Sequence, residues 1–507
     1  MAYHTGLYLF IFLPIALIVY QAVPQKHRWK ALLFFGYAFF YLISGKLLLY
    51  LLGTTIFTHY IGLWLETAAR ERRKAVLAFG VLTLLGVLGY LKYYHFFAQN
   101  LNFLTIRAVG ETFMPIRTLL LPVGISFYTL QAVGYMADVY WGKIKAEHHL
   151  GKIALFLGFF PQIMEGPISM YSQTAEQLWK GEGLSASGLW NGGVRILWGL
   201  FKKMVIADRL YILVGQVFDH HQNYSGLVTA AAAVAYTIQL YMEFSGSMDI
   251  VIGSGRMFGV TLPENFRQPF ASVNAAEFWR RWHITLGTWL KTYVFYPVSM
   301  SSPVKRWNQF GRKHCGKYIT KLGISAMALF PVWLCNGLWH GPRWSYIFFG
   351  MYYFAVLMAG IAVEPIRDWF LRISHIREDS WYWRWIRILK TWGIIFIGEL
   401  FFRANGFRAG LEMFLGIFRD FSLEPLRDGT FLNLGLRPGD FYAAAAGCLI
   451  VGIYGMVQER GMARGISIDK MKLPVRWGIC YVLILTLVIF GAYGTGYQQV
   501  DLIYAGF

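Results

Sequence analysis

The chain has 507 residues, of which 56% are hydrophobic, 18% are aromatic and only 15% are charged. A soluble protein of this length would form two or three domains with a larger share of charged residues, so the composition excludes an ordinary soluble enzyme. The net charge of +20 does not indicate nucleic-acid binding, because the basic residues are spread over loops between apolar runs. We therefore expect one membrane domain, residues 1–507. Solvated cytoplasmic loops account for most of the positive charge, and the alternative is that part of it attracts anionic lipid headgroups or an acidic partner protein.

Long apolar runs follow one another along the chain and predict an all-α, polytopic membrane protein. A spanning helix needs about 20 apolar residues, and we expect roughly 11 to 13 membrane segments, re-entrant segments included. The candidate segments are 6–23, 31–44, 46–63, 75–95, 117–138, 190–217, 227–248, 322–340, 344–363, 388–402, 440–457 and 475–495.

The first run, 6–23, is predicted to be an anchor rather than a signal peptide. No Lys or Arg precedes it, whereas Lys26, Arg28 and Lys30 follow it. The positive-inside rule then places 24–30 in the cytoplasm, together with the basic loops 68–74 and 141–152. We expect a multi-pass protein of the cell membrane with an extracytoplasmic N-terminus.

Three segments interrupt the apolar pattern. The sequences GFFPQIMEGPIS at 158–169 and NGLWHGP at 336–342 predict broken helices that line internal cavities, since Gly and Pro at membrane depth expose backbone groups to be satisfied. The segment 256–321 holds eleven Lys and Arg against two acidic residues. It is either a cytoplasmic loop or backbone that dips into a protein-lined cavity.

His340 is the first candidate for chemistry. It lies in the apolar context LFPVWLCNGLWHGPRW, where an ionisable group is costly unless it faces a cavity. A buried, neutral imidazole has a ring nitrogen that can take a proton from a hydroxyl. The alternative is a histidine that forms a hydrogen bond between two helices.

His283 is the second candidate, in EFWRRWHITLGTWLKTYVFYP. Helical spacing would place it on one face with Trp279, Trp282 and Leu286, away from Arg281. The alternative is an amphipathic helix at the membrane interface, where Trp and Arg are both favoured.

Gln239, Glu243 and Asp249 lie in an otherwise apolar run and are not expected to face lipid. They orient a catalytic imidazole, bind a polar substrate or form hydrogen bonds between helices. The four cysteines share no short spacing, so no metal site or disulfide framework is predicted, and no permanently bound cofactor is expected. Phosphate-binding glycine loops and hydrolase or zinc-protease motifs are not found in the sequence.

Several long motifs resemble the membrane-bound O-acyltransferase family, in the bacterial branch that serves alginate O-acetylation and teichoic acid D-alanylation. The likeness is nearly full length, with the two histidines in a core of about 121–345. The motifs are LPVGISFYTLQAVGYMADVY at 121–140, FFPQIMEGPI at 159–168, GLFKKMVIADRL at 199–210, YTIQLYMEFSG at 236–246, GRMFGVTLPENFRQPF at 255–270, EFWRRWHITLGTWL at 277–290 and NGLWHG at 336–341.

The resemblance implies that His340 is the catalytic histidine and His283 the second active-site position. It also implies a ring of helices around a central funnel, with a cytoplasmic donor side and an extracytoplasmic acceptor side. His283 or the indole of Trp282 is expected to stabilise the oxyanion. The chain departs from the family pattern at Glu165, Glu243 and Asn336. The candidate substrate-lining side chains are Trp282, Trp279, Asn336, Trp339, Glu243, Asp249, Gln239 and Glu165.

Two substrates fit the resemblance. The motifs favour acetyl transfer from acetyl-CoA or a carrier-protein thioester to an exopolysaccharide, and the second interpretation is D-alanyl transfer from a carrier protein to teichoic acid. Either system is expected to use a separate extracytoplasmic partner protein. A transporter or flippase of polymers or lipids is the alternative from another class, but it predicts internal repeats, which the sequence does not show.

Overall fold

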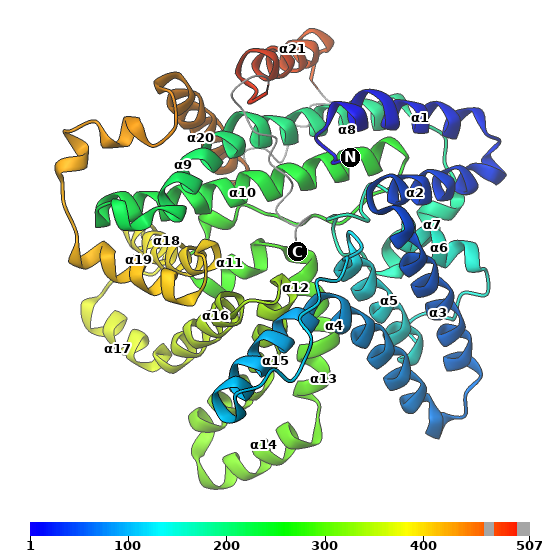
Figure 1. The fold of residues 1–507 in the computed structure, drawn as a ribbon, viewed down its shortest axis with the longest axis horizontal. Coiled ribbons are helices and arrows are strands. Elements are labelled where there is room, and N and C mark those ends of the chain that lie inside the picture. Colours follow the sequence, from blue (N-terminus) through cyan, green and yellow to red (C-terminus); the bar gives the residue numbers. More distant parts are fainter. Residues whose placement is uncertain (461–470, 494–507) are drawn as a thin grey trace. The chain divides into compact units, whose positions relative to one another are not determined.

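The computed structural model describes residues 1–460 and 471–493, and within these ranges the chain is helical (Figure 1). The only β-type pairing among the described residues is one isolated antiparallel bridge between Phe266 and Trp282. The all-α expectation is therefore confirmed. The chain divides into two compact units, Met1–Gly199 with Ser247–Glu264, and Leu200–Gly246 with the described residues from Asn265 onward.

Seven helical stretches among the described residues are long and apolar enough to cross a membrane. Large apolar side chains on them are exposed, for example Leu82 at 68% and Val482 at 63%. Such surfaces require lipid as their solvent, which supports a multi-pass membrane protein. The stretches are Gln25–Thr67, Arg70–Val109, Gly226–Met257, Gly316–His340, Trp344–Ala362, Pro438–Glu459 and Leu473–Phe490.

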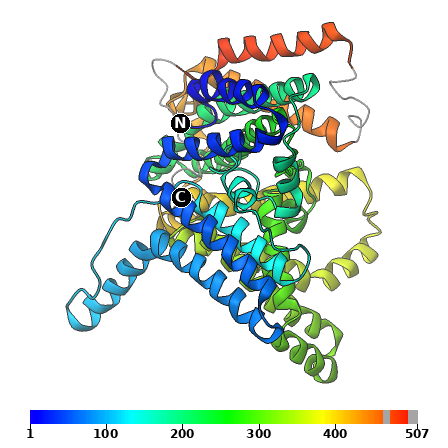
Figure 2. The same ribbon diagram turned by 90° about the vertical axis from the view of Figure 1, so that its right-hand side faces the viewer.

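The first unit begins with a π-helical turn, Leu7–Phe12, that continues into a short apolar helix. In this unit α3 packs against both α5 and α6, and α4 packs against α5. Figure 2 shows the long helix α4 with the non-helical chain that returns from its C-terminal end. The helices are α1 (Leu13–Ala22), α2 (Arg28–Ser44), α3 (Leu48–Thr67), α4 (Arg70–Val109), α5 (Ile125–Tyr140), α6 (Leu150–Gly158), α7 (Tyr171–Lys180) and α8 (Ala186–Leu200).

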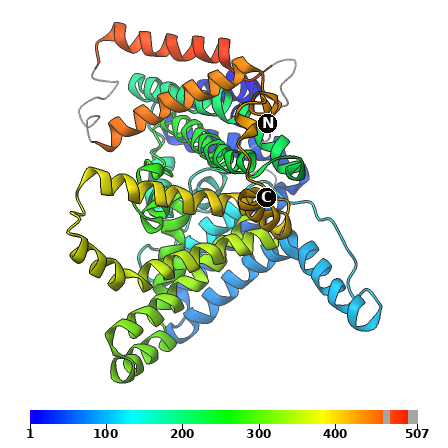
Figure 3. The same ribbon diagram turned by 90° about the vertical axis from the view of Figure 1, so that its left-hand side faces the viewer.

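The second unit is built around the helix pair α15 and α16, with α18 packed on α16 and α14 folded back on α15 (Figure 3). Its π-helical segment η4 (Phe201–Ala207) packs against α20 and α21. Helix α10 (Gly226–Met257) contributes residues to both units. The other helices are α9 (Asp208–Asp219), α11 (Ala275–Arg281), α12 (Ile284–Leu290), α13 (Tyr296–Ser299), α14 (Ser302–His314), α15 (Gly316–His340), α16 (Trp344–Ala362), α17 (Glu364–Ser374), α18 (Trp381–Arg403), α19 (Phe407–Arg419), α20 (Pro438–Glu459) and α21 (Leu473–Phe490).

The remaining elements are short turns. The 3-10 turns are η2 (Gln25–His27), η3 (Gly45–Leu47), η5 (His221–Asn223), η6 (Pro269–Ala271), η8 (Glu424–Leu426) and η9 (Thr430–Asn433), and a third π-helical segment, η7, spans Lys291–Phe295. The polar segment 256–321 is therefore largely helical. It contains η6, α11, α12, η7, α13 and α14.

Three boundaries differ from the sequence-based prediction. The run 117–138 is helical only from Ile125, because Gly124 adopts φ 73° and Pro122 precedes it. The run 190–217 is one helical path with a π-helical segment, 201–207, in its middle. The last predicted run, 475–495, is helical to Phe490, and its residues 494–495 lie outside the described residues.

The predicted break at 158–169 is confirmed. Helix α6 ends at Gly158, and turns without helix follow to Met170. Tyr3 satisfies part of this buried backbone, because its hydroxyl donates to the Phe160 carbonyl at 2.8 Å and accepts from the Met164 amide at 3.2 Å. The break at 336–342 begins later than predicted, since α15 continues through Asn336 to His340.

Candidate active site

The segment that carries His283 is not the single helix that its sequence pattern predicted. Helix α11 starts after Asn274, whose side chain accepts a hydrogen bond from the Glu277 amide at 2.8 Å, and it ends at Arg281. Trp282 is extended, and His283 adopts φ 45° and ψ 52° before α12 begins. A left-handed backbone is uncommon for a residue other than Gly, so the surrounding contacts must hold His283 in place.

Backbone pairing with the preceding loop provides part of that support. The Arg267 amide donates to the Arg281 carbonyl at 2.9 Å, and the Ile284 amide donates to the Asn265 carbonyl at 3.0 Å. These two bonds frame the bridge between Phe266 and Trp282. The loop and the histidine segment therefore lie antiparallel, which the helical reading of 277–290 did not predict.

Asn265 adds side-chain contacts to the same pairing. Its Oδ1 accepts from the Thr285 amide at 3.1 Å and from the Thr285 hydroxyl at 2.9 Å. The Nδ1 atom of His283 lies 3.1 Å from the same oxygen. The ring also contacts Phe244 edge to face, with centroids 4.9 Å apart, and only 4% of the residue is exposed.

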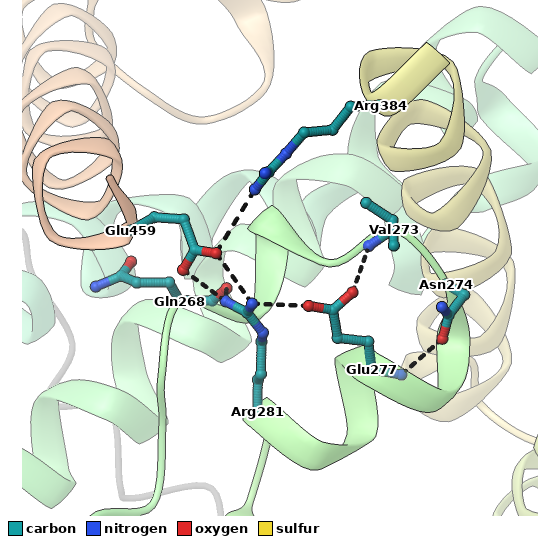
Figure 4. A network of polar contacts seen from close by, with 7 residues as sticks. All are labelled: Gln268, Val273, Asn274, Glu277, Arg281, Arg384 and Glu459. Atoms are coloured by element: carbon teal, nitrogen blue, oxygen red, sulfur yellow. Dashed lines mark hydrogen bonds and ion pairs between the residues drawn. The ribbon is translucent and has the colours of Figure 1, made fainter. Parts of the chain in front are cut away.

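Arg281 fixes the other end of the extended segment, as Figure 4 shows. Its guanidinium contacts both carboxylate oxygens of Glu459, at 2.7 and 3.0 Å, and Oε1 of Glu277 at 2.7 Å. Arg384 approaches Glu459 at 3.6 Å. A bidentate arginine pair is directional, so this network ties α11 to the end of α20 two residues before His283.

His340 is the last residue of α15 and is 6% exposed. Gly341 follows with φ 145° and ψ 175°, a conformation that suits glycine and ends the helix. The imidazole is enclosed by aromatic rings, with Phe402 at 5.0 Å and Phe349 at 5.6 Å between centroids. Apolar side chains therefore surround this imidazole at the end of α15.

Trp339 links the two histidines. Its indole lies 5.4 Å from the His283 ring and 5.2 Å from the His340 ring, both in near-perpendicular arrangements. The structure therefore brings both predicted histidines into contact with one indole within the second unit. This juxtaposition joins residues that lie 57 positions apart in the sequence.

Close packing of α15 on α16 helps to position His340. A Cβ atom on Gly337 would lie 2.5 Å from the Tyr346 carbonyl oxygen, and a Cβ on Gly350 would also collide with backbone of the partner helix. Small residues at such crossings let two helices approach closely. Gly337 lies three residues before His340, so this contact fixes the end of α15.

The other predicted residues of the second unit lie in two places. Trp279, Trp282 and Asn336 are near the histidine segment or on α15, and Trp282 stacks on Phe278 at 5.4 Å. Within residues 1–460 and 471–493, the buried polar atoms without a hydrogen-bond partner include the Trp279 Nε1 and the Asn336 Oδ1. Such atoms are costly unless a substrate or water satisfies them, which suits a substrate-binding role.

Glu243 and Gln239 belong to a second buried cluster. Lys203 Nζ lies 3.2 Å from Glu243 Oε1 and 2.7 Å from Asp208 Oδ1. Gln239 Nε2 lies 3.5 Å from Glu243 Oε2. Glu243 therefore pairs with a lysine, and this ion-pair cluster explains why a carboxylate is buried at this position.

The two remaining predicted residues lie in the first unit. Asp249 accepts from Arg195 Nε at 3.0 Å, and Arg195 also holds Glu264 with two bonds. Glu165 is 2% exposed in the broken segment after α6. Among the described residues, no group of three or more His, Cys, Asp or Glu side chains is arranged to hold a metal ion.

Sequence reasoning missed three residues that the structure makes prominent. Asn265 stands in a quoted motif, but only the fold reveals its contact with His283. Lys203 was visible as a charged residue in an apolar run and is fully buried. Glu399, 1% exposed, is the only acidic residue in GIIFIGELFF, and its Oε2 has no hydrogen-bond partner among the residues that the structure describes.

The chain is similar in sequence to one family model and to several acyltransferases that modify cell-surface polymers. Residues 143–310 match the family model described as the membrane-bound O-acyltransferase family. A probable alginate O-acetylase of Pseudomonas aeruginosa is 32% identical over 90% of this chain and 82% of its own length. A peptidoglycan O-acetyltransferase of Helicobacter pylori is 29% identical, over 82% of this chain and 79% of its own. A teichoic acid D-alanyltransferase of Bacillus subtilis is 27% identical, over 51% and 63%.

Proposed function

The chain belongs to the membrane-bound O-acyltransferase family, and we propose that it transfers an acetyl group from a cytoplasmic thioester to hydroxyls of an extracytoplasmic polysaccharide. The observation that carries this proposal is the near full-length similarity to alginate O-acetylases, at 32% identity. The chain is thus an acyltransferase acting on a cell-surface polymer. We further propose that the acyl group is acetyl and that the acceptor is an alginate-like polysaccharide.

His340 serves as the general base in this reaction. Its ring takes the proton of the attacking hydroxyl as the hydroxyl oxygen bonds to the thioester carbonyl carbon. The carbonyl oxygen becomes an oxyanion, and the intermediate collapses as the carbon–sulfur bond breaks. His340 then returns the proton to the leaving thiolate, so that ester and thiol are the products. The aromatic enclosure of His340 supports this role, because a neutral imidazole is required.

Donors for the oxyanion come from indole N–H groups near the histidines. The Trp279 Nε1 is buried without a hydrogen-bond partner in the described part of the chain, and we assign it this role ahead of Trp282. Asn336 Oδ1, on the turn before His340, accepts a hydrogen bond from the incoming substrate. The donor is acetyl-CoA or an acylated carrier protein, which reaches the site from the cytoplasmic side of the cell membrane.

D-alanyl transfer to teichoic acid is the second candidate. The observation that favours it is the similarity to teichoic acid D-alanyltransferases, which covers 51% of this chain at 27% identity. The similarity to alginate O-acetylases is both longer and higher, so acetyl transfer ranks first. In either case an extracytoplasmic partner protein completes delivery to the polymer.

The test uses purified protein in proteoliposomes, with radiolabelled acetyl-CoA or D-alanyl carrier protein as donor. Alginate oligosaccharides and teichoic acid serve as acceptors, with and without periplasmic or cell-wall extract as a source of the partner. We expect label from acetyl-CoA on the polysaccharide, and none with His340→Ala, which should keep its fold. Labelling of teichoic acid alone would establish the second candidate, and transport of intact donor without any acyl product would overturn both.

A further inference from the structure

The hydrogen bonds of Asn265 determine which atom of its amide faces His283. A backbone N–H can only donate, so the Asn265 atom that lies 3.1 Å from the Thr285 amide must be the oxygen. The reverse orientation would set two donors against each other. The Thr285 hydroxyl, 2.9 Å away, adds a second donor to the same oxygen.

The same oxygen determines where the proton of His283 resides. An oxygen that faces Nδ1 at 3.1 Å forms a hydrogen bond only when Nδ1 carries the hydrogen. His283 lies outside the seven apolar helices, and burial lowers its pKa to about 3, so the ring is neutral near pH 7. A neutral imidazole has one N–H, so the Nε2 atom carries the lone pair.

We infer that Asn265 is a positioning residue that holds His283 in the tautomer protonated at Nδ1, so that Nε2 accepts a hydrogen bond from the hydroxyl-bearing substrate. This inference rests on the proposed function and assigns His283 to the acceptor rather than to the oxyanion. A lone pair repels an oxyanion but attracts a hydroxyl proton. The triad logic in which a third group fixes the tautomer of a histidine supports the assignment.

The backbone keeps this arrangement from relaxing. A flip of the His283 ring would exchange Nδ1 for a carbon and lose the bond to Asn265. The left-handed backbone of His283 and the two backbone bonds that frame Trp282 restrict the alternative positions of the ring. The tautomer is consequently set by the fold before any substrate arrives.

The decisive measurement is nitrogen-15 NMR of the histidine-labelled protein in nanodiscs, with His283→Gln used to assign the resonances. Chemical shift and one-bond N–H coupling distinguish a protonated ring nitrogen from one with a lone pair. We expect a protonated Nδ1 and an unprotonated Nε2 in the wild type, and mixed tautomers in Asn265→Leu. A proton on Nε2 of wild-type His283 would overturn the inference. Because no turnover is needed, this result is independent of whether acetyl transfer is observed.

Activity variants give a second readout. Asn265→Leu should lower kcat/KM for the acceptor by about 100-fold, because the loss of a correctly positioned acid–base group typically costs a factor of this size. The KM of the donor should be nearly unchanged. Asn265→Asp keeps the accepting oxygen and adds a charge, so it should restore activity and move the acidic limb of the pH profile upward. Thr285→Val is the matched control. It removes one hydrogen bond to Asn265, so kcat/KM for the acceptor should fall by about tenfold at most. Equal losses in Asn265→Leu and Thr285→Val would show a merely structural role and contradict the inference.

Discussion

The ammonium of Lys203 lies between two carboxylates, 2.7 Å from Asp208 and 3.2 Å from Glu243. Lys203 has no exposed surface, and Glu243 is 1% exposed. The lysine comes from the π-helical segment η4, a kind of helix that often occurs at functional sites. One buried cation thus compensates two acids, of which Glu243 is buried and Asp208 is partly buried, so the cluster is sensitive to the loss of the lysine.

Replacing this lysine should destabilise the protein strongly. Lys203→Met leaves the buried Glu243 and the partly buried Asp208 without their cation, and we expect a loss of roughly 3–5 kcal/mol. The double variant Lys203→Met/Glu243→Met removes one of the stranded acids and should recover part of that loss. Thermal unfolding in detergent measures both. Additive losses in the double variant would show that the two side chains do not interact.

Loosening the Arg281 network should reduce activity while the fold is retained. Arg281→Lys keeps the charge but loses the bidentate contact with Glu459, so the extended segment before His283 gains freedom. We expect kcat to fall about tenfold, because the histidine is less well positioned. The control is Arg384→Gln, whose side chain approaches Glu459 at only 3.6 Å and should affect transfer less. A larger effect of the control would assign the role of the network to Arg384.

The free energy of unfolding should decrease as the pH is lowered, because His283 is buried in its neutral form. Its folded-state pKa is lowered to about 3, below the ordinary value, so the unfolded chain binds a proton that the folded chain does not. The contribution is fully present above the unfolded pKa and is lost as pH falls toward the folded one. Between about pH 7.5 and pH 5 the loss is about 2 kcal/mol.

The measurement compares apparent unfolding temperatures of the wild type and His283→Gln at both pH values. The other titrating groups are shared by the two proteins, so their effects cancel in the difference. We expect the wild type to lose more stability than the variant on acidification. Parallel curves for the two proteins would contradict a neutral, buried His283.

Adding one methyl group at Gly337 should disturb the helix that ends at His340. The new Cβ would lie 2.5 Å from the Tyr346 carbonyl oxygen, so α15 and α16 must separate. We expect Gly337→Ala to cost about 1–3 kcal/mol and to lower transfer activity. Gly360→Ala, on α16 with open space around it, should instead stabilise by up to about 1 kcal/mol. Unfolding and acyl-transfer assays on both variants test this contrast.

Replacing Glu399 with an apolar residue should stabilise the protein. It is 1% exposed, and no described residue forms a hydrogen bond with its Oε2, which is a costly state for a carboxyl group. Glu399→Met has a similar volume without the polar atoms, and we expect it to raise the free energy of unfolding by about 1–3 kcal/mol. Chemical denaturation of both proteins measures the difference. A destabilised Glu399→Met would mean that the carboxyl group makes a favourable interaction in the fold.

The local pattern of the sequence was sufficient for the class of fold and for the broken segment after α6. Apolar runs of membrane-spanning length predict helices in lipid, and Gly158 and Pro167 predict the break, because both effects act over a few neighbouring residues. The motifs around His340 and His283 were also sufficient to select both as candidates. Helical periodicity failed at Trp282 and His283, where the chain is extended and then left-handed.

The partners of the candidate residues were decided by tertiary structure. Asn265 contacts a histidine 18 residues away, and Lys203 contacts a glutamate 40 residues away. Trp339 lies against both imidazoles only because α15 ends beside the His283 segment. Composition and periodicity report burial and local conformation, whereas these contacts depend on how distant segments pack, which no short window of sequence contains.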